Sequence, residues 1–262
     1  MNWPLLLGIS LPLLLLALLL AGLPRLRRNP RGTLAFGLII LLARVYVRLC
    51  HRLRVEGLDN LRSVDADQGL IVVANHTAGL DPVLIQVTLD FEIRWMMARD
   101  MAEPGLAWFW RWLRVILVDR TTRDPRSLLA ALRHVKKGGA LGLFPEGFIE
   151  RPPGELRPFR PGIGLLVTRC KCPVLPVVIE GTPQVDPAWA SLFRLSRSRL
   201  RILPLIPAEA LRFDDPEEAT TFLQARFAEA TGWSVGEERP TRPASKHYGL
   251  WGSVRGKRVR GS

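Results

Sequence analysis

Six short apolar runs alternate with stretches of helical pattern, and this alternation is the feature that most restricts the fold. Such runs are typical of strands that are buried on both faces of a sheet. Strands that alternate with helices predict the α/β class, with a central, mostly parallel or mixed sheet flanked by helices. The runs are Leu70–Ala74, Ile93–Ala98, Val115–Val118, Leu141–Phe144, Val174–Ile179 and Leu200–Leu205.

Three helices can be predicted from their end signals. The clearest begins at Asp124-Pro125, an N-cap followed by proline at the first helical position, and ends where two lysines meet two glycines at 136–139. We expect a second helix from Pro161 to the cysteines near 170 and a third from Pro216 to about Thr231.

The N-terminal stretch is long and apolar enough to cross a membrane. Leu5 to Leu23 contains 19 residues without a charge, about 28 Å as a helix, which is close to the hydrocarbon thickness of a bilayer. A cleaved signal peptide is the competing interpretation. No basic residue precedes the run, and the run exceeds the usual apolar core of such a signal. We therefore expect a retained membrane segment.

An arginine-rich stretch follows, and it predicts where the rest of the chain lies. From Met1 to Val55 there are eight arginines and no acidic residue, and the next apolar stretch, Leu34–Ala43, has only ten residues. Two layouts fit: a single span with its basic flank in the cytoplasm, or a helical hairpin that turns at Pro24–Pro30 and enters one leaflet. Both predict a membrane protein with its active site at the cytoplasmic face, which we expect to be the bacterial inner membrane.

Charge and length complete the predicted organisation. A formal net charge of +13 favours anionic partners, and with a membrane segment present the expected partner is an anionic membrane surface and not nucleic acid. We expect membrane-anchoring helices at 1–50, an α/β domain at 51–235 and a basic, flexible tail at 236–262, rich in Pro, Gly, Ser and Arg.

The cysteines do not predict a metal site or a disulfide. Cys50, Cys170 and Cys172 are odd in number, and the Cys-Lys-Cys pair has no second cluster to complete a zinc tetrahedron. We expect reduced thiols, no metal and no cofactor.

A cluster of aromatic residues suggests a second contact with lipid. Arginines at 99, 111 and 114 flank it, which favours a bilayer interface or an acyl-chain groove, with core packing as the alternative. The aromatic residues are Trp95, Trp108, Phe109, Trp110 and Trp112.

Polar segments follow two of the apolar runs, where sheet enzymes place their catalytic residues. In the first of them, His76 and Asp81 are five residues apart. If the chain leaves a strand and turns into a helix there, the carboxylate folds back on the imidazole and fixes its tautomer. A neutral histidine so oriented is a suitable general base. The alternative is a capping aspartate and a structural histidine. No protein nucleophile stands beside the pair, so direct attack by a bound hydroxyl is expected.

The order of the polar segments resembles the lysophosphatidate acyltransferase family of membrane glycerolipid acyltransferases. The family's first motif reads Asn-His, four variable residues, Asp, and its third reads Phe-Pro-Glu-Gly. Both are complete here, at Asn75–Asp81 and Phe144–Gly147, and the similarity spans roughly Leu53 to Thr182. Val174–Val177 matches the final motif, which is mostly a buried strand.

The resemblance implies transfer of a fatty acyl group from acyl-coenzyme A or acyl carrier protein to a lysophospholipid hydroxyl, first of all lysophosphatidate to phosphatidate. Two alternatives remain: another acceptor, such as lyso-ornithine lipid or a remodelled lysophospholipid, or a catalytically weak lipid-binding homologue. His76 would be the base and Asp81 its orienting partner. The expected substrate-binding residues are Asn75, Arg99, Arg120, Glu146 and Gly147.

Arg120 would bind the acceptor phosphate, with a structural ion pair as the alternative, whereas Glu146 would support acceptor binding, with a salt bridge as its alternative. Arg114 and Leu117 stand where the family usually has glycine and phenylalanine. Phe148-Ile149-Glu150 replaces the usual Thr-Arg-Ser and makes the acceptor less certain than the reaction. Replacement cations would come from Arg151, Arg157 or Arg160.

Overall fold

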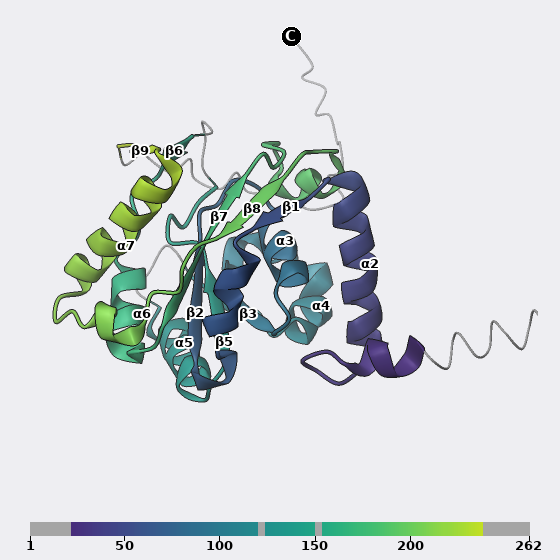
Figure 1. The fold of residues 1–262 in the computed structure, drawn as a ribbon, viewed down its shortest axis with the longest axis horizontal. Helices are drawn as coiled ribbons and strands as arrows, with labels where there is room; N and C mark the ends of the chain where they lie inside the picture. The colour runs from purple at the N-terminus through teal and green to yellow at the C-terminus, as the bar shows by residue number, and fades with distance from the viewer. Residues whose placement is uncertain (1–21, 120–123, 150–153, 238–262) are drawn as a thin grey trace, which may run out of the picture.

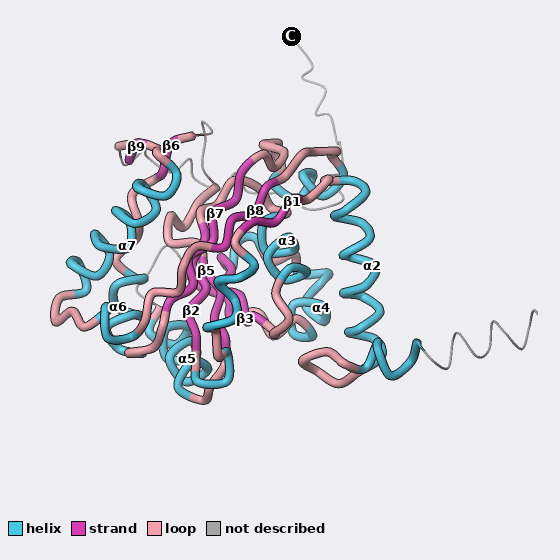
Figure 2. The backbone as a smooth tube through the Cα atoms, viewed as in Figure 1, coloured by secondary structure: helices cyan, strands magenta, loops and turns pink. Residues whose placement is uncertain are grey.

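The computed structural model describes residues 22–119, 124–149 and 154–237, which form a seven-stranded sheet between two layers of helices (Figures 1 and 2). The strand order is β1-β8-β7-β2-β5-β3-β4. The strands are β1 (Arg54–Glu56), β2 (Leu70–Ala74), β3 (Ile93–Ala98), β4 (Ile116–Val118), β5 (Ala140–Leu143), β7 (Val174–Glu180) and β8 (Arg199–Ile202). A separate parallel pair joins β6 (Glu155–Leu156) to β9 (Ser234–Val235).

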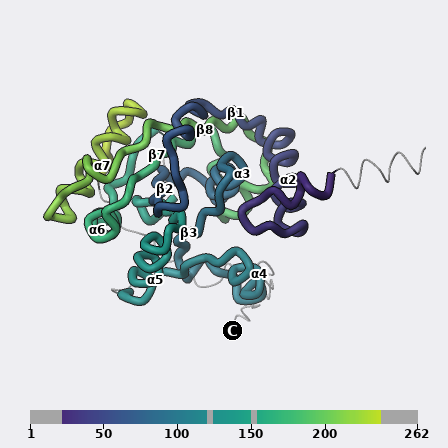
Figure 3. The backbone as a smooth tube through the Cα atoms, turned by 60° about the horizontal axis from the view of Figure 1, so that its bottom comes forward, coloured from purple at the N-terminus to yellow at the C-terminus, as the bar shows by residue number. Residues whose placement is uncertain are grey.

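Helices cover both faces of the sheet. In Figure 3 the sheet runs between α6 and α7 on one side and α2 and α3 on the other. The α-helices are α2 (Leu34–Cys50), α3 (Asp81–Thr88), α4 (Ala107–Trp112), α5 (Pro125–Lys136), α6 (Gly162–Cys170) and α7 (Pro216–Thr231). The 3-10 helices are η1 (Leu58–Ser63), η2 (Ala66–Gln68), η3 (Arg99–Met101), η4 (Pro104–Leu106), η5 (Ala188–Phe193) and η6 (Ala208–Leu211).

The sheet is mostly parallel, and this decides where a site can form. β7, β2, β5, β3 and β4 all run in the same direction, whereas β8 is antiparallel to β7 and β1 is parallel to β8. Five carboxyl ends therefore meet at one edge of the sheet, where α/β proteins usually bind ligands. The predicted α/β class with a mostly parallel sheet is confirmed.

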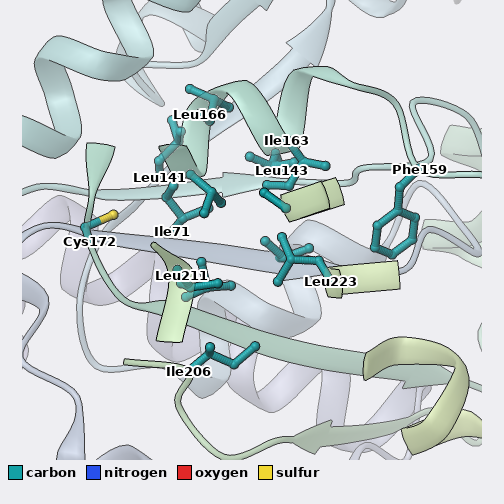
Figure 4. Close-up of a cluster of buried hydrophobic side chains, with 14 of the residues drawn as sticks. Ile71, Leu141, Leu143, Phe159, Ile163, Leu166, Cys172, Ile206, Leu211 and Leu223 are labelled. Carbon is teal, nitrogen blue, oxygen red and sulfur yellow. The ribbon is translucent and has the colours of Figure 1, made fainter. Parts of the chain in front are cut away.

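The side chains of β2 divide between two hydrophobic clusters. Ile71 and Val73 belong to the cluster that packs under α5, α6 and α7, and Figure 4 shows part of it. Leu70, Val72 and Ala74 point to the other face, where α2 and α3 pack. All five side chains are fully buried, which explains why the run is apolar throughout and does not alternate with polar residues.

Most predicted elements are found within two residues of their expected ends. Asp124 caps α5 as predicted, because its side chain accepts hydrogen bonds from the N–H groups of Arg126 and Ser127. The strand predicted at 200–205 begins at Arg199 and ends at Ile202, ahead of Pro204, which has no N–H to donate to a neighbouring strand. The short strands β1, β6 and β9 and helix α4 were not predicted.

The predicted N-terminal membrane segment, Leu5–Leu23, lies almost entirely outside the described residues. The first described range begins with a helical turn at 22–27, after which the chain reverses its course and enters α2. This helix continues through Arg44 and Arg48, so the apolar stretch at 34–43 is not a separate short helix. In the three described ranges no helix is long and apolar enough to cross a membrane, and the predicted membrane helix gains no support from them. Of the predicted tail, only residues 236 and 237 are described.

A close crossing of α6 and α7 allows a test of the packing. A Cβ atom on Gly164 would lie 1.8 Å from the carbonyl oxygen of Pro216, whereas one on Gly162 of the same helix would have no heavy atom within 4 Å. We expect Gly164→Ala to lower the free energy of unfolding by about 2–3 kcal/mol, because over-packing forces backbone shifts. Gly162→Ala should change it by less than about 1 kcal/mol. Urea unfolding of both variants measures the difference. Equal free energies of unfolding would show that the backbone at the crossing shifts at no cost.

Candidate active site

The polar segments after β2, β5 and β7 meet at the carboxyl edge of the sheet. The register pairs Val73 with Leu143 on one side and Ala74 with Val177 on the other. The chain that leaves β2 at Asn75 therefore emerges between the end of β5 and the end of β7. Sequence motifs 70 residues apart become neighbours because their strands are neighbours.

The carboxylate of Asp81 is buried and receives three close hydrogen bonds. Its Oδ2 lies 2.9 Å from His76 Nδ1, 2.6 Å from the N–H nitrogen of Thr77 and 2.8 Å from that of Ala78. Asp81 is also the first residue of α3, where the helix dipole favours a negative charge. In the tautomer that donates from Nδ1, Nε2 of His76 is the basic nitrogen, and this arrangement suits a general base.

A stack of three aromatic rings fixes the plane of the imidazole. The ring of Phe144 lies 4.0 Å from that of His76 with an interplanar angle of 12°, and Trp95 stacks on Phe144 at 5.1 Å and 13°. The rings come from three neighbouring strands or strand ends. A Cβ atom on Gly142 would lie 2.6 Å from Trp95 Cε3, so only glycine there leaves room for the indole. Trp95 therefore belongs to the site and not to an exposed aromatic surface.

Glu146 ties the histidine loop to the chain that precedes α6. Its carboxylate accepts hydrogen bonds from the N–H of His76 at 2.9 Å and from the N–H of Arg157 at 3.1 Å. The side chain is almost fully buried. The next residue, Gly147, has a φ of 71°, a left-handed conformation that glycine adopts without strain.

Two arginines surround the unusual Phe148 that follows the glycine. The guanidinium carbons of Arg157 and Arg160 lie 5.3 Å and 5.5 Å from the centre of its ring. The N–H of Arg160 also donates to the carbonyl of Pro145 at 2.8 Å. Of the three predicted replacement cations, Arg157 and Arg160 therefore lie beside the Phe144–Gly147 turn, whereas Arg151 lies outside the described residues.

The remaining expected substrate-binding residues occupy different positions. Asn75 is buried, and its side-chain amide exchanges two hydrogen bonds with the backbone of Ile179, so it joins the end of β2 to β7. Arg99 is exposed at the start of η3, directly after β3 and hence at the same edge. Arg120 lies outside the described residues. The N–H of the preceding residue, Asp119, donates to Asp124 Oδ2 at 3.1 Å. The hydrogen bonds from the N–H groups of Asp119 and Ser127 keep the pKa of Asp124 below its usual value.

The sequence did not predict the contact between Thr77 and Thr182 that supports the loop after β2. Thr77 Oγ1 lies 2.5 Å from Thr182 Oγ1 and 3.3 Å from Asp81 Oδ1. A cavity of about 360 Å³ opens beside these threonines and reaches Trp233. No motif marks Thr182, because its contact with Thr77 arises only when β7 pairs with β2.

The contact of the aromatic cluster with lipid stays a prediction, and four of its five residues are half-buried. Trp108 is 63% exposed. Trp112 instead packs against Phe36 at 5.9 Å and against the guanidinium of Arg31 at 4.7 Å. Trp112 therefore anchors the start of α2, and within the aromatic cluster Trp108 is the residue that is largely exposed.

Comparison with known proteins agrees with the resemblance seen in the sequence. The family model described as Acyltransferase matches residues 52–180. The chain is 26% identical over 181 residues to the 1-acyl-sn-glycerol-3-phosphate acyltransferase alpha of Ovis aries, which covers 68% of this chain and 62% of the sheep protein. It is 22% identical over 169 residues to the 1-acyl-sn-glycerol-3-phosphate acyltransferase of Bacillus subtilis (strain 168), covering 63% and 81%.

The fold also matches a solved structure. The crystal structure of the 1-acyl-sn-glycerophosphate (LPA) acyltransferase PlsC from Thermotoga maritima superposes with a TM-score of 0.59 and 24% identity, covering 74% of this chain and 77% of that one. At this identity the match shows a shared fold. The chain spans about three fifths of the length of the sheep relative.

The hydrogen bonds on Asp81 generate a stability prediction. Asp81→Ala would leave the N–H groups of Thr77 and Ala78 buried without a partner, and we expect a loss of about 2–4 kcal/mol in the free energy of unfolding. Asp90→Ala, at an exposed position just after α3, should change it by less than about 0.5 kcal/mol. Urea unfolding compares the two. A neutral effect of Asp81→Ala would mean that the loop does not depend on this carboxylate.

Proposed function

The chain belongs to the lysophosphatidate acyltransferase family, and from this premise we propose that it transfers an acyl group from an acyl thioester to the free hydroxyl of lysophosphatidate. The observation that carries the proposal is the His76–Asp81 hydrogen bond at the carboxyl edge of the sheet. The His76 side chain is 19% exposed and that of Asp81 is fully buried. The base is thus accessible to a substrate while its partner is shielded from water.

The proposed reaction begins when Nε2 of His76 removes the proton of the acceptor hydroxyl. The oxygen attacks the thioester carbonyl, the tetrahedral intermediate collapses, and the C–S bond breaks. The leaving thiolate takes the proton back from the imidazolium, so an ester and a free thiol are formed. Asp81 stabilises the imidazolium while it carries the proton. General base catalysis of this kind contributes roughly 10²–10⁴-fold to a rate.

The surroundings of His76 support the same role by restricting its motion. The hydrogen bond to Asp81 fixes one ring atom, the stack on Phe144 fixes the ring plane, and the bond from the backbone N–H to Glu146 fixes the main chain. A base held in this way needs no reorganisation before it takes a proton, and positioning of reacting groups supplies a large part of enzymatic rate enhancement. Glu146 therefore acts through the loop.

The acceptor is proposed from the positive charge near the Phe144–Gly147 turn. Arg157 and Arg160 lie beside it, and Arg99 stands at the end of β3 on the same edge. Arg120 joins this set by its match to the family motif. A guanidinium binds two phosphate oxygens at once, so such a cluster favours a phosphate monoester such as lysophosphatidate. The donor is an acyl thioester of coenzyme A or acyl carrier protein.

The apolar side of α2 supports attachment to a membrane. Its inner face buries Phe36 and Val47, and Arg44 donates to the carbonyl oxygen of Val87 in α3. The outer face carries a row of large apolar side chains that are 45–70% exposed. An apolar face flanked by arginines suits the surface of an anionic bilayer, which we propose is the cytoplasmic face of the membrane. The row is Leu38, Ile39, Leu41, Leu42, Val45 and Leu49.

His76→Ala tests the reaction. In purified full-length protein supplied with acyl-coenzyme A and lysophosphatidate, we expect thiol release to fall by roughly 10²–10⁴-fold because the base is gone. Circular dichroism should show an unchanged fold, since His76 is one of several donors on Asp81. Thiol release at the parental rate would exclude His76 as the base.

The same assay with a panel of lysolipids separates the alternatives. Preference for lysophosphatidate supports the proposal. Turnover of a phosphate-free acceptor such as lyso-ornithine lipid, with lysophosphatidate untouched, would assign a different acceptor. Binding of lysolipid without thiol release from either donor would identify a lipid-binding homologue.

Arg160→Gln tests recognition of the phosphate. We expect KM for lysophosphatidate to rise about tenfold with little change in kcat, because one charge-assisted contact is lost. Arg169→Gln is the matched control, since Arg169 is exposed at the opposite end of α6. An equal rise in KM for both variants would indicate a general loss of positive charge and no contact at Arg160.

A further inference from the structure

The most exposed large apolar side chains of the described residues gather in one place. Phe193 and Leu195 are each 79% exposed and Leu49 is 70% exposed. Leu49 lies at the end of α2, and the other two belong to the segment 188–195, which includes η5. Trp189 of this segment is 39% exposed, and its ring contacts that of Phe193. These four residues, Leu49, Trp189, Phe193 and Leu195, are called the apolar patch.

Main-chain hydrogen bonds hold the two parts of the patch together. The N–H of Ser196 donates to the carbonyl of Cys50 at 3.1 Å, and that of Ser198 donates to the carbonyl of His51 at 2.9 Å. The segment 188–195 therefore lies beside the C-terminal end of α2 (Figure 1). The patch is formed by two elements that are about 140 residues apart in sequence.

Buried polar contacts fix the segment from the inside. The ring of His51 is fully buried and lies 2.8 Å from Ser196 Oγ and 3.1 Å from the hydroxyl of Tyr46. Burial lowers the pKa of His51, which favours the neutral ring that bridges these two hydroxyls. Ser191 is also fully buried and donates to Ala188. Phe193 and Leu195 are thus presented outward by a segment whose inner side is well packed.

The segment also touches the loop that carries the catalytic pair. A Cβ atom on Gly79 would lie 2.6 Å from the carbonyl oxygen of Ala188 and 3.3 Å from the N–H nitrogen of Trp189. Gly79 stands between His76 and Asp81 in the sequence. The backbone of 188–189 therefore packs directly on the catalytic loop, and whatever binds the patch lies next to the site.

The charges around the patch select its partner. Four exposed arginines flank it, and no acidic residue occurs from Pro187 to Ala208. A surface that combines apolar side chains, a tryptophan and arginines complements a bilayer that contains anionic lipid. Exposed apolar patches on folded proteins commonly mark interaction sites. The arginines are Arg48, Arg52, Arg194 and Arg197.

We propose that the apolar patch inserts into the surface of an anionic bilayer and brings the catalytic loop to the place where lysolipid leaves the membrane. The contact continues the outer face of α2 and adds a second, sequence-distant element to it. The identity of the lipid as substrate rests on the proposed function, whereas the contact with the bilayer does not.

Fluorescence quenching tests the contact without reference to activity. A fluorescent unnatural amino acid replaces Phe193 in the full chain, which is reconstituted into vesicles of phosphatidylcholine and phosphatidylglycerol with brominated acyl chains. We expect the bromine to quench this label. The matched control carries the label at Leu129, an apolar residue of α5 that is 45% exposed on the other side of the sheet, and it should stay unquenched.

Two results would overturn the proposal. An unquenched label at 193 would place the segment in water. Energy transfer between labelled copies, with no quenching by lipid, would assign the patch to a second copy of the chain. Quenching at 193 in a protein that releases no thiol would support the contact and reject the proposed function, so the two failures are distinguishable.

Kinetics test whether the contact serves substrate delivery. We expect the double variant Phe193→Ser, Leu195→Ser to lose about tenfold or more in kcat/KM for lysophosphatidate presented in vesicles, because two apolar side chains no longer enter the bilayer. Its kcat/KM for a short-chain, water-soluble lysophosphatidate should equal that of the parent, as should both values for Leu129→Ser. Equal losses on both forms of the acceptor would indicate damage to the fold and overturn the delivery role.

Discussion

The buried carboxylate of Asp81 organises the site, because a buried charge must have all its partners in place. Taking a carboxylate out of water costs several kcal/mol unless hydrogen bonds replace the lost hydration. The N–H groups of Thr77 and Ala78, the ring of His76 and the positive end of α3 supply that replacement. The loop after β2 can therefore adopt few conformations, and the one it adopts aims the imidazole at the sheet edge.

The order of the strands in the sheet places further supports around the loop after β2. β5 lies between β2 and β3, so Phe144 stands between His76 and Trp95 and the three rings stack in that order. β7 lies on the other side of β2, and the backbone of Ile179 in β7 exchanges two hydrogen bonds with the side-chain amide of Asn75. Each neighbouring strand contributes one support to the same short loop. The parallel sheet thus holds His76 from both sides.

The sequence predicted the parts of this arrangement that depend on local pattern. Continuous apolar runs such as Leu70–Ala74 mark strands buried on both faces, and the spacing of His76 and Asp81 fits a strand that turns into a helix. Strand β1 escaped prediction because its three residues, Arg54–Glu56, are mostly polar. The stack of His76 on Phe144 was not predicted, because no local sequence pattern shows which strands become neighbours. Segment 188–195 escaped because a 3-10 turn has no apolar period to detect.

The ring stack has a consequence for the direction of proton transfer. Phe144 covers one face of the imidazole, and Asp81 occupies Nδ1. Nε2 has no hydrogen-bond partner among the described residues, and its lone pair lies in the plane of the ring. Under the proposed function, a hydroxyl that gives up its proton to His76 therefore approaches along that plane. The proposed enzyme would then select an acceptor by the direction of its hydroxyl as well as by its charge. A lysolipid with the right headgroup but a hydroxyl perpendicular to the ring plane would bind without reacting.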